Sequence, residues 1–130
     1  FELVNKKWGG GVLISVKSNF LCEQIDMSSI TNSIHAVDIL GIKITHNNTV
    51  LYVILLYIPP TTTFSDYELV LNLLEQQGYC ANNIILLGDF NIPHFNNFHV
   101  EDNKSTILQN FIEFSGLKQY NNVENIQNRL

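Results

Sequence analysis

The chain has 130 residues and a formal net charge of −5, and 45% of its residues are hydrophobic against 15% that are charged. This balance is typical of one globular domain and argues against a disordered chain. The acidic charge also argues against a protein that binds nucleic acid through its own charge, so contact with phosphate would need a divalent metal held by carboxylates.

No basic segment followed by an apolar stretch marks a signal peptide. The longest apolar run, residues 50–60, is about half of the roughly 20 residues that a membrane span needs. We therefore expect an intracellular protein, nuclear or cytoplasmic, that is neither secreted nor transmembrane and has no membrane partner.

The first half of the chain predicts extended strands. A glycine triplet, Gly9-Gly10-Gly11, precedes the first apolar run, and glycines there allow close backbone approach. The turn cluster His46-Asn47-Asn48-Thr49 separates two later runs and predicts a hairpin whose second strand is buried on both faces. The strands expected in this half are residues 12–16, 20–26, 36–45 and 50–58.

A helix is predicted after these strands. Pro59-Pro60 ends the last strand, because proline cannot donate to the ladder. The pattern Ser65-x-x-Glu68 is typical of a capping box, and apolar side chains then recur with helical spacing to about Gln77, where Gly78 ends the helix. The apolar positions of this helix are Tyr67, Val70, Leu71 and Leu74.

A short apolar strand, residues 84–87, follows and is expected at the centre of the sheet. A long polar loop, residues 92–103, then leads to a second helix that ends at Gly116. The apolar stripe of this helix is Ile107, Leu108, Phe111 and Phe114. The order combines a hairpin with a helical crossover, which indicates a mixed arrangement of helices and strands rather than a purely doubly wound sheet.

The clearest chemical signal is Gly88-Asp89-Phe90-Asn91, which leaves the strand at residues 84–87 abruptly. A carboxylate just past the carboxyl end of a central strand lies at the rim of the sheet, where active sites gather. If the backbone stays extended, Asp89 and Asn91 project to one side, so that one can exchange a proton while the other donates a hydrogen bond. A plain Asx turn fits the same residues and, for this motif alone, is the commoner case.

Tyr57 gives the second signal, because it ends an apolar strand just before a proline-fixed turn. Such a turn can hold the hydroxyl group rigidly at the rim, although a strand tyrosine with its hydroxyl in water is the commoner case. We expect the strands that end at Tyr57 and Asp89 to be neighbours in one sheet. Tyr57, Asp89 and Asn91 should then converge on one rim.

The four histidines show no HExxH or HxH spacing, so spacing alone assigns no metal-binding residue. His94 and His99 share the loop that follows Asn91, and either could lie near the same rim. A solvated loop histidine is the commoner case for both.

Three motifs together carry a resemblance. The glycine triplet with Val12-Leu13-Ile14, then Tyr57-Ile58-Pro59-Pro60, then Gly88-Asp89-Phe90-Asn91 resemble the endonuclease/exonuclease/phosphatase superfamily in order and spacing. The chain is most similar to the endonuclease domain of non-LTR retrotransposons, and residues 1–130 are expected to form one partial domain of this kind. The resemblance implies an α+β fold, a two-sheet β-sandwich flanked by helices (DNase I-like) and truncated at both ends.

The resemblance also implies a chemistry, the magnesium-dependent hydrolysis of a phosphodiester. Tyr57 matches the family tyrosine that contacts the scissile phosphate, and Asn91 matches the asparagine that donates a hydrogen bond to it. Asp89 matches the aspartate that orients the attacking water or protonates the leaving oxygen. DNA would be the partner of the intact parent protein, and no small-molecule cofactor is implied.

Two parts of the family pattern have no match. The family carries an asparagine and a metal-ligating glutamate before the glycine-rich strand, and a catalytic histidine in a Ser-Asp-His segment after a Leu-Asp strand. Here Asn128-Arg129-Leu130 is similar only to the approach to that Leu-Asp strand. The resemblance therefore implies a nuclease by family whose present chain is inactive alone and does not bind magnesium tightly.

Two other functions remain open. Within the same superfamily, the chain could belong to an abasic-site repair nuclease or to a phosphoesterase of inositol lipids or sphingomyelin. A reverse transcriptase encoded downstream would favour the retrotransposon. Outside the superfamily, the chain could be a non-enzymatic remnant α/β module with a fortuitous Gly-Asp-Phe-Asn motif, in which case Asp89 should lie away from Tyr57.

Overall fold

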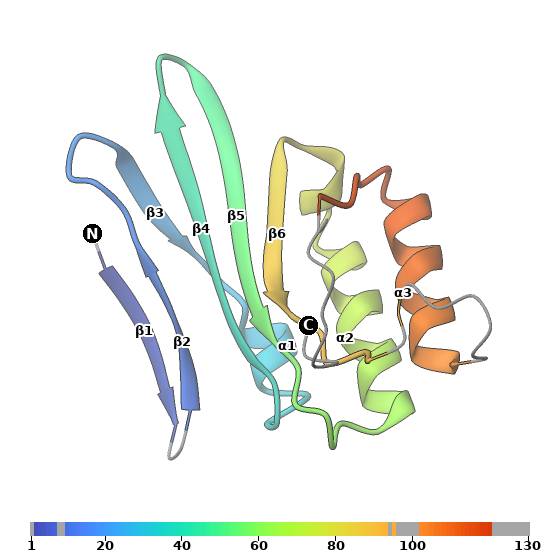
Figure 1. Ribbon diagram of the computed structural model, residues 1–130. Coiled ribbons are helices and arrows are strands. Elements are labelled where there is room, and N and C mark those ends of the chain that lie inside the picture. Colours follow the sequence, from blue (N-terminus) through green and yellow to red (C-terminus); the bar gives the residue numbers. More distant parts are fainter. Residues whose placement is uncertain (1, 8–9, 94, 96–101, 121–130) are drawn as a thin grey trace.

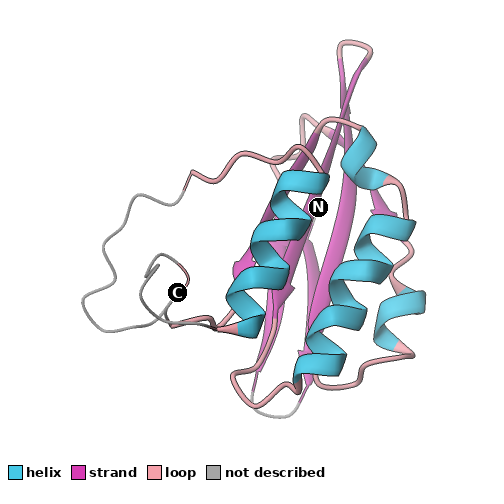
Figure 2. Cartoon of the chain, turned by 90° about the vertical axis from the view of Figure 1, so that its right-hand side faces the viewer, coloured by secondary structure: helices cyan, strands magenta, loops and turns pink. Residues whose placement is uncertain are grey.

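The computed structural model describes residues 2–7, 10–93, 95 and 102–120 of an α+β fold in three layers (Figure 1). A two-stranded hairpin forms one layer, a four-stranded sheet lies in the middle, and the helices cover the other face of that sheet (Figures 1 and 2). The strands are β1 (Glu2–Lys7), β2 (Gly10–Ser15), β3 (Leu21–Ile25), β4 (Asp38–His46), β5 (Thr49–Tyr57) and β6 (Ile84–Asp89). The helices are α1 (Ser28–Thr31), α2 (Phe64–Gln76) and α3 (Asn103–Phe114), with a 3-10 turn η1 (Tyr79–Ala81). Within these described ranges, no helix has both the length and the apolar character that crossing a membrane requires.

The four-stranded sheet is mixed, with the order β3-β4-β5-β6. The first three strands are antiparallel, and β6 runs parallel to β5 because α2 crosses over between them. The hairpin expected of β4 and β5 is confirmed: Asn47 and Asn48 both have positive φ, 47° and 63°, which suits a tight two-residue turn that pairs His46 with Thr49. The central place expected for residues 84–87 is wrong, because β6 is the last strand of the described sheet.

The main core lies between this sheet and the helices. Ile54 and Leu56 of β5, and Ile58 directly after it, alternate toward the helices and are buried. The stripe expected on α2 is confirmed, since Tyr67, Val70, Leu71 and Leu74 are all buried there. Alternation on the strand and helical spacing on α2 therefore meet in one apolar layer.

Two details of the helices differ from the sequence expectation. Thr63, not Ser65, is the N-cap of α2: its backbone is extended and its hydroxyl accepts the Asp66 N–H at 3.1 Å. On α3, Leu108 and Phe111 are buried as expected, but Phe114 is 78% exposed, because the buried stripe of this helix follows Ser105, Leu108 and Phe111 and Phe114 lies to one side of it.

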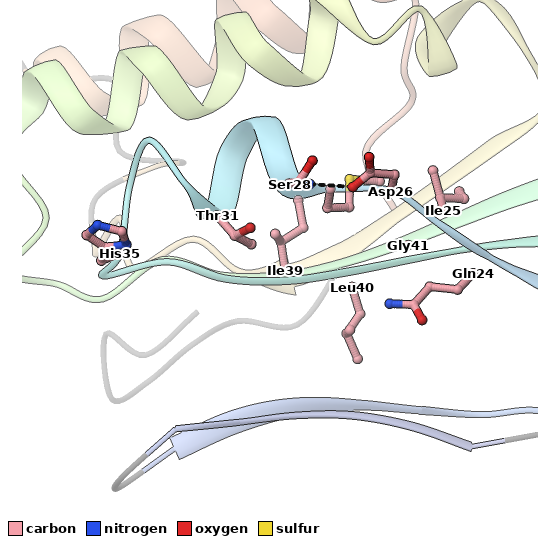
Figure 3. A pocket seen from close by; sticks show the side chains of 10 residues that line it. Gln24, Ile25, Asp26, Ser28, Thr31, His35, Ile39, Leu40 and Gly41 are labelled. Atoms are coloured by element: carbon pink, nitrogen blue, oxygen red, sulfur yellow. Dashed lines mark hydrogen bonds between the residues drawn. The ribbon is translucent and has the colours of Figure 1, made fainter.

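The β1–β2 hairpin covers the second face of the sheet, where β2 contacts β4 and β5, and β1 contacts β4. Figure 3 shows Leu40 and Gln24 directed toward this hairpin, on the side away from α1. Under the hairpin, Leu40 and Ile42 of β4 are buried. The hairpin does not cover β6, whose side chains on this face, Ile85 and Leu87, are 44% and 49% exposed.

Candidate active site

Three strand ends bring acidic and tyrosine side chains into one row. Tyr57 on β5 is the register partner of Asp89 on β6, and Asp38 on β4 is the register partner of Tyr57 on its other side. The expectation that the strands of Tyr57 and Asp89 are neighbours is therefore confirmed. Register partners point to the same face of a sheet, so the three side chains share one rim. This is the hairpin face, because Asp38 lies two residues from Leu40 on the same strand.

Asn91 joins the row through a turn rather than through extended backbone. Its φ is 48°, and its backbone N–H donates to Asp89 Oδ1 at 3.0 Å, which closes an Asx turn. Its side-chain Nδ2 donates to the Ile58 carbonyl oxygen at 2.8 Å, while the Ile58 N–H donates to the Asp89 carbonyl oxygen at 3.0 Å. The Asx turn is therefore present, and it is the device that holds Asn91 and Asp89 beside Tyr57.

Substituting Asn91 with glycine should separate the contribution of the side-chain hydrogen bond to Ile58 from that of the backbone at positive φ. Glycine tolerates the positive φ but loses the bond from Nδ2 to Ile58, so we expect Asn91→Gly to lower the free energy of unfolding by about 1 kcal/mol. Asn91→Ala should lose about 1 kcal/mol more, because alanine is strained at that φ. Urea unfolding measures both. An Asn91→Gly chain as stable as the original would mean that the amide bond contributes nothing.

Asp38 is the residue of this row that the sequence expectation missed. It is buried, with a relative exposure of 4%, at the start of β4. The sequence places Ala36 at the start of this strand, whereas the strand begins at Asp38 and Ala36 is exposed. The available signal was a carboxylate inside an otherwise apolar run, since buried charges are rare unless they are paired or functional.

The loop after Tyr57 is fixed by α3. Lys104 Nζ donates to the Thr62 carbonyl oxygen at 2.6 Å and lies 5.8 Å from the centre of the Tyr67 ring. Asp102 caps α3 by accepting the Lys104 N–H at 3.0 Å. Burial, and then the nearby charge of Asp102, raise the pKa of Tyr67 well above its ordinary value, so this hydroxyl stays neutral. The loop that follows Tyr57 is therefore attached to α3 through Lys104, beside a Tyr67 hydroxyl that stays neutral.

The described residues include no group of three or more His, Cys, Asp or Glu side chains placed to hold a metal ion. His94 and His99 lie outside the described residues. A cleft of about 630 Å³ lies at the end of β3 beside α1 and includes Asp26, Thr31 and His35 (Figure 3). It contains none of the three residues of the row, so we place the candidate site by the strand register and not by the cleft.

Comparison with protein-family models, with curated proteins and with solved structures gives no match. The candidate site therefore depends on geometry and chemistry alone. The alternative of a non-enzymatic module predicts that Asp89 lies away from Tyr57. This geometry is not observed, because the two residues are paired in register.

Proposed function

We propose that this chain is part of an endonuclease domain of the kind encoded by non-LTR retrotransposons, which hydrolyses phosphodiester bonds of DNA with the help of magnesium. The observation that carries the proposal is the pairing of Tyr57 with Asp89 at the ends of two neighbouring strands. A tyrosine hydroxyl and a carboxylate at one rim are the groups that bind a phosphate and move a proton beside it.

Each residue of the site has a separate task in this proposal. The Tyr57 hydroxyl donates to a phosphate oxygen. Asp89 orients the attacking water or protonates the leaving oxygen, and its second carboxylate oxygen is not used by the turn. Asn91 has two N–H donors on Nδ2, and since one is bound to Ile58, the other is left for the phosphate.

Magnesium fits the donor chemistry of Asp89 in part. Magnesium is commonly bound by one or two carboxylates together with phosphate oxygens and water, and Asp89 supplies one carboxylate. When bound, the ion neutralises charge on the phosphate. A single carboxylate makes a weak site, which agrees with the absence of a match for the family glutamate.

The two-sheet sandwich belongs to the same proposal. The β1–β2 hairpin is a second sheet packed on the first, with Leu40 and Ile42 buried beneath it. Ile85 and Leu87 of β6 continue this apolar face without cover from the hairpin. Further strands beside β2 would cover them, as a DNase I-like sandwich requires.

The purified 130-residue chain should nick plasmid DNA with magnesium no faster than its Asp89→Ala variant, because one carboxylate and one tyrosine do not complete the proposed machinery. The measurement is a time course on supercoiled plasmid, with and without chelator. Robust nicking that Asp89→Ala abolishes would contradict this expectation.

A second chain, extended by the strands that carry the family glutamate and histidine, should nick plasmid in the same assay. Duplex DNA with an abasic site and sphingomyelin are the parallel substrates. Preference for the abasic site or for the lipid would favour the repair nuclease or the phosphoesterase. No activity on any of the three would refute the proposed function.

A further inference from the structure

Asp38 has no role in the function proposed above, although it is the most buried carboxylate that the structure describes. It faces Tyr57 across the β4–β5 pair, one strand away from Asp89. We propose that Asp38 is a positioning residue, whose carboxylate holds the Tyr57 side chain where its hydroxyl meets the phosphate. The role of Asp38 toward a phosphate rests on the proposed function, whereas the pairing of Asp38 with Tyr57 does not.

The register gives Asp38 direct access to Tyr57. Directly opposed residues of an antiparallel pair have Cβ atoms about 4.5–5.5 Å apart and point to the same face. A carboxylate at that distance lies beside the ring, whose edge is electropositive and attracts an anion. Asp38 can therefore restrict the side-chain torsions of Tyr57 without touching the substrate.

The burial of Asp38 places a carboxylate on a strand face that is otherwise apolar. The next two residues on this face of β4, Leu40 and Ile42, are buried and apolar. An apolar side chain would also fill the place of Asp38, and it would avoid the cost of taking a charge out of water. A carboxylate in such a place, beside a tyrosine at a rim, is typical of a functional group.

Direct metal binding together with Asp89 is the competing role for Asp38. The two carboxylates are separated by β5, which puts their strands two spacings, about 9–10 Å, apart. Tyr57 lies between the two carboxylates in the same row and is the register partner of both, so it is the nearer partner of Asp38. The register therefore favours a role of Asp38 through Tyr57.

The first test uses the 130-residue chain as it is, with ¹³C-labelled tyrosine rings observed by NMR. Tyr57→Phe identifies the Tyr57 signals by removing them. Asp38→Asn should shift or broaden those signals and leave the Tyr67 signals in place, whereas Asp26→Asn, which changes an exposed carboxylate in the turn after β3, should leave Tyr57 unchanged. Unmoved Tyr57 signals in Asp38→Asn would overturn the proposal. If Asp38→Asn does not fold, Asp38→Thr, which suits a strand, replaces it.

The second test is a double-mutant cycle in the extended chain. Asp38→Asn should lower kcat for plasmid nicking roughly 10- to 100-fold with little change in KM, because it misplaces a group without removing it. In a Tyr57→Phe background the same substitution should change kcat by less than about twofold, because the hydroxyl that it positions is already gone. Equal effects in both backgrounds would overturn the proposal. An extended chain without any activity would refute the proposed function instead, and the NMR result would still decide the role of Asp38.

Discussion

Asp89→Asn is expected to lower the rate of plasmid nicking by the extended chain by about 10²–10⁴, with substrate binding little changed. The amide keeps the size of the carboxylate and can still accept the Asn91 N–H through its oxygen, so the turn should survive. What it loses is the ability to take up or release a proton beside the phosphate. The loss should therefore fall on kcat and not on KM.

Tyr57→Phe is the matched control for this experiment. It removes one hydroxyl from the neighbouring strand but keeps the ring, so its effect on kcat should be smaller. Chelation of magnesium should abolish nicking by all variants. If the extended chain nicks DNA as fast with asparagine as with aspartate at position 89, Asp89 is only a turn former and the catalytic assignment is wrong.

Gly88→Ala should cost about 2–3 kcal/mol of unfolding free energy. A Cβ at Gly88 would lie 2.1 Å from the Leu56 carbonyl oxygen, and that atom belongs to the backbone of the neighbouring strand. The two strands must move apart to admit it, and they are the strands that pair Tyr57 with Asp89. The substitution should therefore weaken the sheet and the site together.

Gly116→Ala provides the comparison, measured by urea unfolding in parallel. Gly116 has a φ of +64° and open space around it, so alanine there should cost only the backbone strain, about 1 kcal/mol. Equal losses for the two variants would show that the close approach of β6 to β5 is relaxed at little cost, against the geometry of Gly88.

The sequence predicts local structure well where periodicity is strong. The α2 stripe and the β4–β5 hairpin are examples, since each depends on residues close in the chain. Strand positions within the sheet depend on distant partners, and so the sequence predicts a central place for the apolar run of β6, which lies at the edge of the described sheet. The sequence predicts no strand at Glu2–Lys7, because this segment has few apolar residues, and its strand β1 is recognised by its register with β2.

In the candidate site, too, some residues can be located from local sequence and others only from distant strand partners. Tyr57 and Asp89 could be found because each ends an apolar strand before a turn, which is a local signal. Asp38 could not be assigned to the same row without the register that places it opposite Tyr57. The sequence predicts Asn91 in the site but with an extended backbone, because positive φ at an asparagine is a property of the turn and not of the spacing.

The asparagine turn between β4 and β5 has a consequence for the opposite end of the sheet. Asn47 and Asn48 form a loop of only two residues, and this length decides which residue of β4 lies across from each residue of β5. Side chains alternate along a strand, so lengthening the loop by one residue and slipping β4 by one place would turn Asp38 away from Tyr57 toward the helices. The distant turn therefore sets the register that pairs Asp38 with Tyr57. Deletions or insertions in the turn would disrupt the candidate site, although no residue of the turn contacts it.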